Sequence, residues 1–331
     1  MTVGATFSQV PQRAMDAIAH AKPDGSVPLL PGFDIKAVLG NRGEVRVWRV
    51  KEVDPPATWY IKRFRNPAVY RRYMEVFRIL GQDEVPKAYL YPVQCAGHDD
   101  FHQLIATYPL QGTSANAIFV RGTRLDKLFS WPCSDMGNLA RRIVRGLRAF
   151  WSYRCEVHPD LYDYRPLESA DRMLKKCERL RNVVPEAWER IHAAVAQHAQ
   201  RLRSISDFDY SLVLGDLTLA NLLIDDEYLG IFDLEDIGIG DWRYDVACLI
   251  QRVSEAETDT YYSSRRVRHF QQLLMDEVGM AIDDPILSIY RIEFYLDMLW
   301  SVMHKNDRNL PRIGLSYQKI EQMLDSHLKG M

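Results

Sequence analysis

Residues 211–236 read SLVLGDLTLANLLIDDEYLGIFDLED, and this stretch decides the fold. It contains two short apolar runs, Asn221–Ile224 and Leu229–Phe232, which are separated by the acidic residues Asp225–Glu227. Apolar runs of this length on either side of a polar turn predict a β-hairpin. The helical patterns on both sides of it make the hairpin a short β-type island within a mainly helical part of the chain.

Three oxygen-bearing side chains flank this hairpin. Asp216 and Asn221 lie at the mouth of the first strand, and Asp233 ends the second. Phosphoryl transfer uses this combination, because one carboxylate orients the attacking hydroxyl while an amide oxygen and a second carboxylate hold Mg²⁺ against the phosphates. We therefore expect Asp216 to be catalytic, and Asn221 and Asp233 to bind the metal. The alternative is a solvated hairpin whose acidic residues only form turns.

The chain upstream of the hairpin has the pattern of a β-meander. From about Pro31 to Leu110, short β-type runs alternate with glycine- and proline-containing turns. The expected runs are Phe33–Leu39, Glu44–Val53, Thr58–Phe64, Lys87–Cys95 and Gln103–Leu110. One helix is expected among them, because Asn66 can cap its start, Pro67 suits its first position and Gly81 follows its end.

Long helices are expected after Gly112. The apolar spacing predicts helices at Met136–Tyr153, Glu186–Leu202, Trp242–Arg252 and Asp284–His304. A small β-rich part followed by a large helical part indicates an α+β, two-lobed fold. We expect the lobes to be residues 1–110, with residues 1–30 as an N-terminal helical extension, and residues 111–331.

The bulk composition excludes several classes of protein. With a net charge of −2 and no basic block, the chain is not expected to bind nucleic acid. It has no apolar run of about 18 residues, so no membrane span is expected. The five cysteines are scattered and lack CxxC spacing, which indicates reduced thiols in a reducing compartment. We expect a cytoplasmic protein.

The hairpin and the residues after it resemble a known family. Residues 240–247, GDWRYDVA, complete a string of the form G-D-x4-N, then φ-D-x-E, then G-D-x3-D-φ-A. This string is similar to that of the aminoglycoside phosphotransferases and choline kinase-like small-molecule kinases. The resemblance implies a protein kinase-like fold in which residues 1–110 bind ATP or GTP, and residues 111–331 carry catalysis and the acceptor. It also implies Mg²⁺ as the cofactor.

One position departs from the family pattern. The family usually has histidine two residues before the catalytic aspartate, where this chain has Leu214. That histidine braces the loop and transfers no proton, so the departure concerns loop geometry and not a reacting group. Two other classes of protein stay open. The first is a nucleotide-binding pseudokinase with a regulatory role, and the second is a non-enzymatic helical interaction protein.

The resemblance extends to the phosphate-binding lysine. Lys62 lies in an apolar run and resembles the lysine that contacts the α- and β-phosphates, whereas Arg63 alternates to the other strand face. The alternative is a solvated lysine on an edge strand. In the family this lysine pairs with a glutamate on the next helix. Glu75 is the only acidic residue between Asp54 and Asp83, so we assign that role to it.

Two further segments match nucleotide-contacting positions of the family. Gly40, Asn41 and Gly43 belong to a turn between two β-type runs that fits a phosphate-covering loop, although such a turn is also common in hairpins. The segment from Tyr108 through Leu110 to Gly112 occupies the position of the hinge, whose backbone would meet the purine edge.

The acceptor is expected to be a small molecule. Protein kinases carry a long activation segment after the metal-binding aspartate, whereas here the seven residues Leu234–Gly240 precede Asp241. Acidic residues in the helical part favour a cationic acceptor, or are ordinary surface acids: Asp160, Asp163, Glu168, Asp171, Glu235, Asp236, Glu293 and Asp297. The acceptor's identity (antibiotic, amino-alcohol or sugar), the choice of ATP or GTP, and the oligomeric state stay open.

Overall fold

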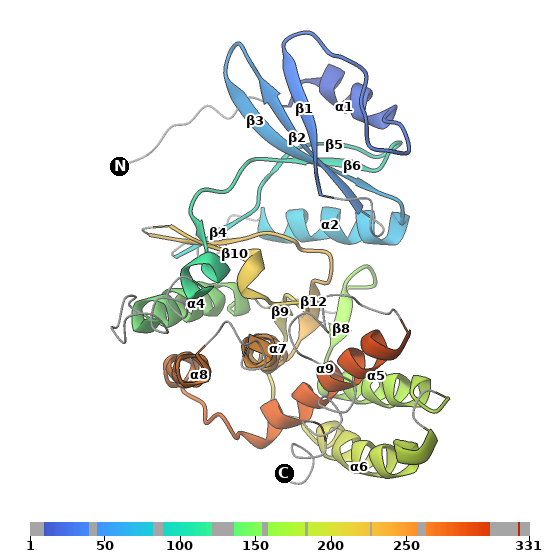
Figure 1. Cartoon of the computed structure of the whole chain (residues 1–331), viewed down its shortest axis with the longest axis vertical. Helices are drawn as coiled ribbons and strands as arrows, with labels where there is room; N and C mark the ends of the chain where they lie inside the picture. Colours follow the sequence, from blue (N-terminus) through green and yellow to red (C-terminus); the bar gives the residue numbers. More distant parts are fainter. Residues whose placement is uncertain are drawn as a thin grey trace. The chain divides into compact units, whose positions relative to one another are not determined.

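The computed structural model describes residues 10–39, 45–81, 89–120, 136–153, 158–182, 185–225, 227–256, 263–304 and 324 (Figure 1). The chain divides into two compact units. Unit 1 comprises residues 1–85, 91–111 and 230–235, and unit 2 comprises residues 86–90, 112–229 and 236–331. The fold is α+β, as the sequence predicts, with a five-stranded sheet in unit 1 and a set of helices in unit 2.

The sheet of unit 1 is antiparallel and has the strand order β1-β2-β3-β6-β5. Its strands are β1 (Phe33–Leu39), β2 (Val45–Glu52), β3 (Ala57–Phe64), β5 (Cys95–Asp99) and β6 (Leu104–Thr107). In the central register, Trp48 of β2 lies opposite Ile61 of β3. Because side chains alternate along a strand, Lys62 and Phe64 point to the opposite face of the sheet from Ile61.

Different helices supply the contacts on the two sides of this sheet. Helix α1 (Gln12–Ala19) buries Met15 and Ile18 in one core cluster with Trp48 and Ile61. On the Lys62 side, the ring of Phe64 packs 5.0 Å from that of Tyr73 in α2 (Pro67–Leu80). The start of α2 is fixed as expected, because the Asn66 side chain accepts a hydrogen bond from the Ala68 N–H at 3.0 Å.

Unit 2 consists mainly of helices: α4 (Met136–Trp151), α5 (Pro166–Arg179), α6 (Pro185–Arg203), α7 (Arg243–Glu255), α8 (Ser264–Val278) and α9 (Pro285–His304). Helix α4 packs against α8, α5 against α6, and α7 against α9. Helix α4 shows why these helices associate, since Leu139, Ile143, Leu147 and Phe150 form a fully buried stripe at helical spacing. Within the described residues, no helix has the length and apolar character that a membrane span requires.

Short strands complete unit 2. The strands β8 (Tyr162–Tyr164), β12 (Gly238–Gly240) and β9 (Ser211–Val213) form a three-stranded sheet in that order. A 3₁₀ turn at Leu219–Asn221 leads into β10 (Leu222–Ile224), which pairs antiparallel with β7 (Thr113–Ser114). Two of the boundaries between the units fall inside strands. One is between residues 90 and 91 in β4 (Leu90–Pro92), and the other is between residues 229 and 230 in β11 (Leu229–Ile231).

Most of the predicted elements are confirmed, including the first three strands, the capped helix and the two runs of the hairpin. The prediction at residues 87–95 was partly wrong. The strand that pairs with β6 is Cys95–Asp99, because the chain turns at residues 100–103, whereas the predicted run ends at Cys95. The assignment of lobes to residues 1–110 and 111–331 stays a prediction.

Candidate functional site

Lys62 and Asp233, two predicted site residues, meet within unit 1. The Lys62 Nζ lies 3.0 Å from Asp233 Oδ1 and 3.6 Å from Glu235 Oε1. It also donates a hydrogen bond of 2.5 Å to the hydroxyl of Tyr73. Burial disfavours the charged ammonium, but Tyr73, Asp233 and Glu235 outweigh that effect and raise the pKa of Lys62. The lysine is therefore a fixed cation beside a carboxylate.

Tyr73 organises this part of unit 1. Its side chain is buried, and its hydroxyl accepts hydrogen bonds from Lys62 and from the backbone N–H of Leu234 at 2.8 Å. Its own proton points to Asp233 Oδ1, at a distance of 3.5 Å. Burial raises the pKa of Tyr73, so the hydroxyl stays neutral. In the sequence, Tyr73 recurs at helical spacing with Val69, Val76 and Leu80, and this apolar pattern does not indicate that its hydroxyl bonds Lys62.

The segment that carries Asp233 has a constrained backbone. Asp233 adopts φ = 65°, a left-handed conformation that is uncommon for residues other than glycine. Helix α2 holds the next two residues, since Tyr73 accepts from the Leu234 N–H and Arg72 donates to the Glu235 carbonyl at 2.7 Å. Conformations of this kind persist where the surrounding structure fixes them, and they concentrate at functional sites.

Lys62 pairs with Tyr73 and Asp233, and not with Glu75 as expected. Glu75 accepts two hydrogen bonds from Arg78, one turn further along α2, at 2.5 and 2.9 Å. Tyr73 lies on the face of α2 that meets β3, and it takes the position beside Lys62 that Glu75 was expected to occupy. Residues two apart on a helix point in different directions, so one helix places Tyr73 and Glu75 on different sides. A role for Glu75 in nucleotide binding stays a prediction.

The loop that carries Asp216 lies in unit 2 and is held by Asp245 of α7. The two carboxylate oxygens of Asp245 accept hydrogen bonds from the N–H groups of Leu214 and Gly215, at 2.9 and 3.0 Å. Trp151 donates its indole N–H to the same carboxylate at 3.0 Å. Burial raises the pKa of Asp245 to about 6, while these hydrogen bonds act in the opposite direction. The structure thus shows what holds the loop backbone at Leu214.

Gly215 is required by the geometry of the loop. Its φ is +77°, and a Cβ atom at this position would collide with the Tyr164 hydroxyl and the Asp236 carbonyl. These two groups bond to each other at 2.8 Å, so neither can move without losing its partner. A side chain at 215 is therefore excluded both by backbone conformation and by space. The glycine allows the chain to turn sharply immediately before Asp216.

Asp216 and Asn221 also lie together in unit 2. The Asn221 side chain donates through Nδ2 to the Asp216 carbonyl at 3.3 Å, and so its amide oxygen remains the atom that suits a cation. The Asp216 carboxylate is half exposed and bonds Arg252 of α7 at 3.0 Å. Arg252 was not expected from the sequence. Its positive charge, at the end of the helix expected at Trp242–Arg252, is the feature of the sequence that could have indicated a partner for a carboxylate.

The donor atoms of these residues fit Mg²⁺. The predicted ligands supply one amide oxygen, from Asn221, and one carboxylate, from Asp233. Within the described part of the chain, no group of three or more histidine, cysteine, aspartate or glutamate side chains forms a metal cluster. Mg²⁺ is commonly held by one or two protein oxygen ligands together with water and substrate phosphates, and amide and carboxylate oxygens are of the kind that it takes. A zinc site would need more nitrogen or sulfur ligands.

The remaining residues that are predicted to contact the nucleotide lie in the N-terminal part of the chain. Tyr108 follows β6 and donates its backbone N–H to the Gln94 carbonyl at 3.1 Å. Its carbonyl, and the backbone of the half-buried Leu110, are the groups that a purine could meet. Gly40, Asn41 and Gly43 lie outside the residues that the structure describes.

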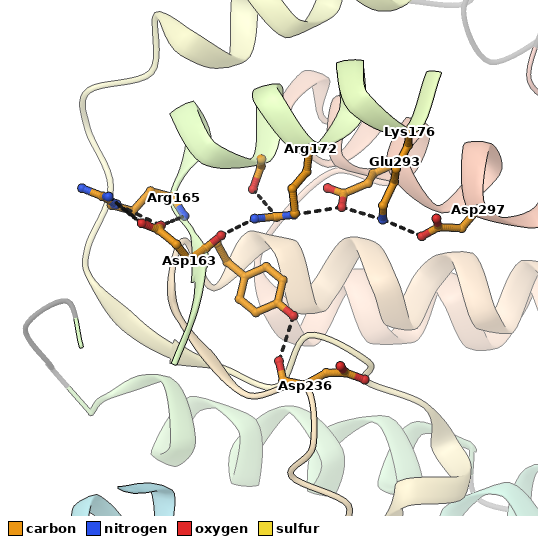
Figure 2. A network of polar contacts seen from close by, with 9 residues as sticks. Asp163, Arg165, Arg172, Lys176, Asp236, Glu293 and Asp297 are labelled. Atoms are coloured by element: carbon orange, nitrogen blue, oxygen red, sulfur yellow. Dashed lines mark hydrogen bonds and ion pairs between the residues drawn. The ribbon is translucent and has the colours of Figure 1, made fainter. Parts of the chain in front are cut away.

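Several acidic residues predicted to attract a cationic acceptor form ion pairs within unit 2 (Figure 2). Glu293 is 2% exposed and lies 3.1 Å from Arg172 and 2.8 Å from Lys176. Burial raises the pKa of Glu293, but the two cations outweigh it and lower the pKa overall. Lys176 also contacts Asp297 at 2.5 Å.

The same pattern extends to other acids of this group. Asp163 bonds Arg165 at 2.8 Å, and Asp171 bonds Arg203. The expectation of a carboxylate-rich face is corrected for the residues in these pairs, because their charges are balanced by cations of the same chain.

The chain is similar to proteins of a known family and to solved structures. The model of a family described as the phosphotransferase enzyme family matches residues 37–273. A search among curated proteins finds no match. A solved structure of an ethanolamine kinase of Plasmodium vivax has a TM-score of 0.58 and 12% identity, and the similarity covers 89% of this chain and 84% of that chain.

Two other solved structures are similar. A streptomycin–ATP–APH(2″)-IIa ternary complex has a TM-score of 0.56 at 12% identity, with 89% of this chain and 93% of that chain covered. A choline/ethanolamine kinase family protein of Mesorhizobium loti has a TM-score of 0.55 at 14% identity, with 96% and 98% covered. These similarities confirm the predicted fold, which is the protein kinase-like fold of this group of phosphotransferases.

Proposed function

The chain belongs to the phosphotransferase enzyme family, and on this premise we propose that it transfers the γ-phosphoryl group of ATP or GTP to a hydroxyl of a small molecule. The observation that carries the proposal is the ion pair between Lys62 and Asp233, with Tyr73 bonded to both. The buried Tyr73 fixes Lys62 beside the carboxylate of Asp233, whose backbone is in the left-handed conformation. A fixed cation of this kind suits phosphates, and the carboxylate suits a divalent cation.

The nucleotide-binding residues are assigned in unit 1. Lys62 would contact the α- and β-phosphates, and the turn containing Gly40, Asn41 and Gly43 would cover them with backbone N–H groups. The backbone of Tyr108 and Leu110 would meet the purine. The streptomycin–ATP complex of a structural relative supports a nucleoside triphosphate as the donor.

Asn221 and Asp233 would hold Mg²⁺ through their side-chain oxygens. When bound, the cation would neutralise charge on the phosphates and keep them in place for transfer. Lys62 bonds Asp233 Oδ1 in the structure, and the carboxylate has a second oxygen, Oδ2, through which Asp233 could hold the metal. The Tyr73 hydroxyl bonds both residues and would keep the lysine beside the carboxylate.

Asp216 would act on the acceptor hydroxyl. Its carboxylate orients the hydroxyl and takes its proton as the acceptor oxygen forms a bond to the γ-phosphorus. The bond from the γ-phosphorus to the β–γ bridging oxygen breaks, and the nucleoside diphosphate leaves with that electron pair. The protein forms no covalent bond to the phosphoryl group, so positioning and charge stabilisation lower the barrier.

A small acceptor is supported by the short connection after Asp233. The residues Leu234–Gly240 include strand β12, which pairs with β8 and β9 and leaves little chain for a peptide-binding platform. The acceptor classes are antibiotics, amino-alcohols and sugars. The ethanolamine kinase and the streptomycin complex among the similar structures support amino-alcohols and antibiotics. A cationic acceptor would need carboxylates other than those already balanced around Glu293.

We place the protein in the cytoplasm.

A nucleotide-binding pseudokinase is the second candidate, and Leu214 is the observation that favours it. The test is to compare wild type with Asp216→Ala for binding of Mg–ATP by calorimetry and for phosphoryl transfer to a panel of acceptors. The proposal expects equal nucleotide binding and transfer in the wild type alone. Binding without transfer by the wild type would favour the pseudokinase, and full activity of Asp216→Ala would refute the role of Asp216. Failure to bind Mg–nucleotide at all would favour a non-enzymatic interaction protein.

A further inference from the structure

One face of helix α7 contacts four consecutive residues of the loop that leads into and past Asp216. Asp245 accepts the N–H groups of Leu214 and Gly215, and Arg252 bonds the carboxylate of Asp216. Between them, the Cys248 thiol donates to the Leu217 carbonyl at 3.5 Å.

The three α7 residues are spaced i, i+3 and i+7. This spacing places them on a single face of the helix, over two turns. One face of helix α7 therefore contacts this whole segment of the loop.

Among the described residues of α7, Arg252 is the one that bonds the side chain of Asp216. Its Nη2 lies 3.0 Å from Asp216 Oδ1, and its Nη1 lies 3.5 Å from Glu255 Oε1. Glu255 is on the same helix and contacts the other terminal nitrogen of the guanidinium. The guanidinium is charged at every accessible pH, so this contact is a charge-assisted hydrogen bond.

We propose that Arg252 is a positioning residue for Asp216, an inference that rests on the proposed function of Asp216. The Asp216 side chain is 45% exposed, and without a partner it would sample several rotamers. Arg252 fixes one oxygen, Oδ1, and thereby directs the other, Oδ2, to the place where the acceptor hydroxyl must lie. The loop backbone, held by Asp245 and Cys248, provides the rigid base for this orientation.

The test uses release of phosphate from Mg–ATP, with water as the acceptor, because this reaction needs no knowledge of the natural acceptor. Arg252→Ala is expected to lower kcat on the order of 10- to 100-fold, as loss of a charge-assisted contact to a catalytic group implies, with KM for Mg–ATP changed less than about twofold. Arg252→Lys should recover part of kcat, since it keeps the charge but not the fork. Added guanidinium chloride should restore part of the activity of Arg252→Ala.

Arg141→Ala is the matched control. It removes an exposed arginine–carboxylate contact of similar length in unit 2, 3.3 Å to Glu277, that includes no predicted site residue. This variant should keep the wild-type kcat. If Arg252→Ala fails to fold, Arg252→Lys and Arg252→Gln carry the test, with thermal unfolding measured for each. A merely structural role predicts loss of stability with no rescue by guanidinium.

A double-mutant cycle separates this inference from the function on which it rests. If Arg252 acts through Asp216, then Arg252→Ala has no further effect in an Asp216→Asn background. An inactive Asp216→Asn combined with an Arg252→Ala that behaves like Arg141→Ala would overturn the inference and leave the proposed function intact. Full activity of Asp216→Asn, or no phosphate release or transfer by the wild type, would overturn the proposed function and the inference with it.

Discussion

Replacing Tyr73 with phenylalanine removes one oxygen atom that three groups of unit 1 share. The Leu234 N–H loses its acceptor at 2.8 Å in a buried position, and Lys62 loses a partner at 2.5 Å. An unsatisfied buried N–H costs about 1–3 kcal/mol, and the weakened lysine contact adds about 1 kcal/mol because Asp233 still pairs with it. Tyr73→Phe should therefore lower the free energy of unfolding by about 2–4 kcal/mol.

The same substitution at Tyr70 is a close control. Tyr70 lies on the same helix and bonds Asp100 at 2.5 Å, but the Asp100 side chain is 77% exposed and water can replace the hydroxyl. Tyr70→Phe should cost less than about 1 kcal/mol. Urea denaturation of both variants measures the difference in unfolding free energy.

Nucleotide affinity provides an independent readout. Lys62 keeps its charge in Tyr73→Phe but loses its fixed orientation, and about 1 kcal/mol of lost orientation corresponds to about a fivefold weaker affinity for Mg–ATP. Calorimetry should show this change for Tyr73→Phe and no change for Tyr70→Phe. If both variants match each other in stability and in affinity, Tyr73 does not organise the site and the reasoning is refuted.

Two further predictions concern the loop before Asp216. Because burial raises the pKa of Asp245 to about 6 in the folded state, above its unfolded value of about 4, the folded protein binds the extra proton. Relative to Asp245→Asn, wild type should gain about 2 kcal/mol of stability as the pH falls from 7 to 4. A difference in unfolding free energy between the two proteins that does not change with pH would contradict this. Gly215→Ala should lose about 2–4 kcal/mol, against about 1 kcal/mol for Gly279→Ala, which has a similar φ of +78° and nothing within 4 Å of the added methyl. Equal losses at the two glycines would mean that the contacts with Tyr164 and Asp236 are not what excludes a side chain.

Long periodic segments of the fold could be predicted from the sequence. The apolar spacing defined α4, α6 and α9, and the residues Asn66, Pro67 and Gly81 marked both ends of α2. The sheet of β8, β12 and β9 could not be predicted in the same way. Its strands are three residues long, and β12 reads Gly-Ile-Gly, so neither length nor β-propensity identifies them.

The site residues also fall into two groups, those that could be predicted from the sequence and those that only the structure shows. Asp216, Asn221 and Asp233 were predicted from the oxygen groups that phosphoryl transfer needs, and Lys62 was predicted from the resemblance to the family. The residues that hold them depend on tertiary contacts. Tyr73 looked like part of an apolar stripe, and only the packing of α2 on β3 brings its hydroxyl to Lys62.

For the acidic residues of the helical part, the sequence left two alternatives open, a face that attracts a cation and ordinary surface acids. The count of carboxylates indicated a cation-attracting face, but pairing is a property of three-dimensional arrangement. Glu293 and Lys176 are 117 residues apart in the chain, and their contact in unit 2 could not be seen in the sequence. The same holds for Arg252 and Asp216, which are separated by 36 residues.

Mass spectrometry of candidate acceptors after incubation with the protein and Mg–ATP tests the central claim most directly. Aminoglycosides, other antibiotics, amino-alcohols, nucleosides and sugars are the compounds to compare, with Asp216→Ala as the control. We expect at least one of them to gain a single phosphoryl group on a hydroxyl with the wild type and none with the variant. The same product formed by both proteins would contradict the account, as would nucleotide binding that leaves every acceptor unmodified.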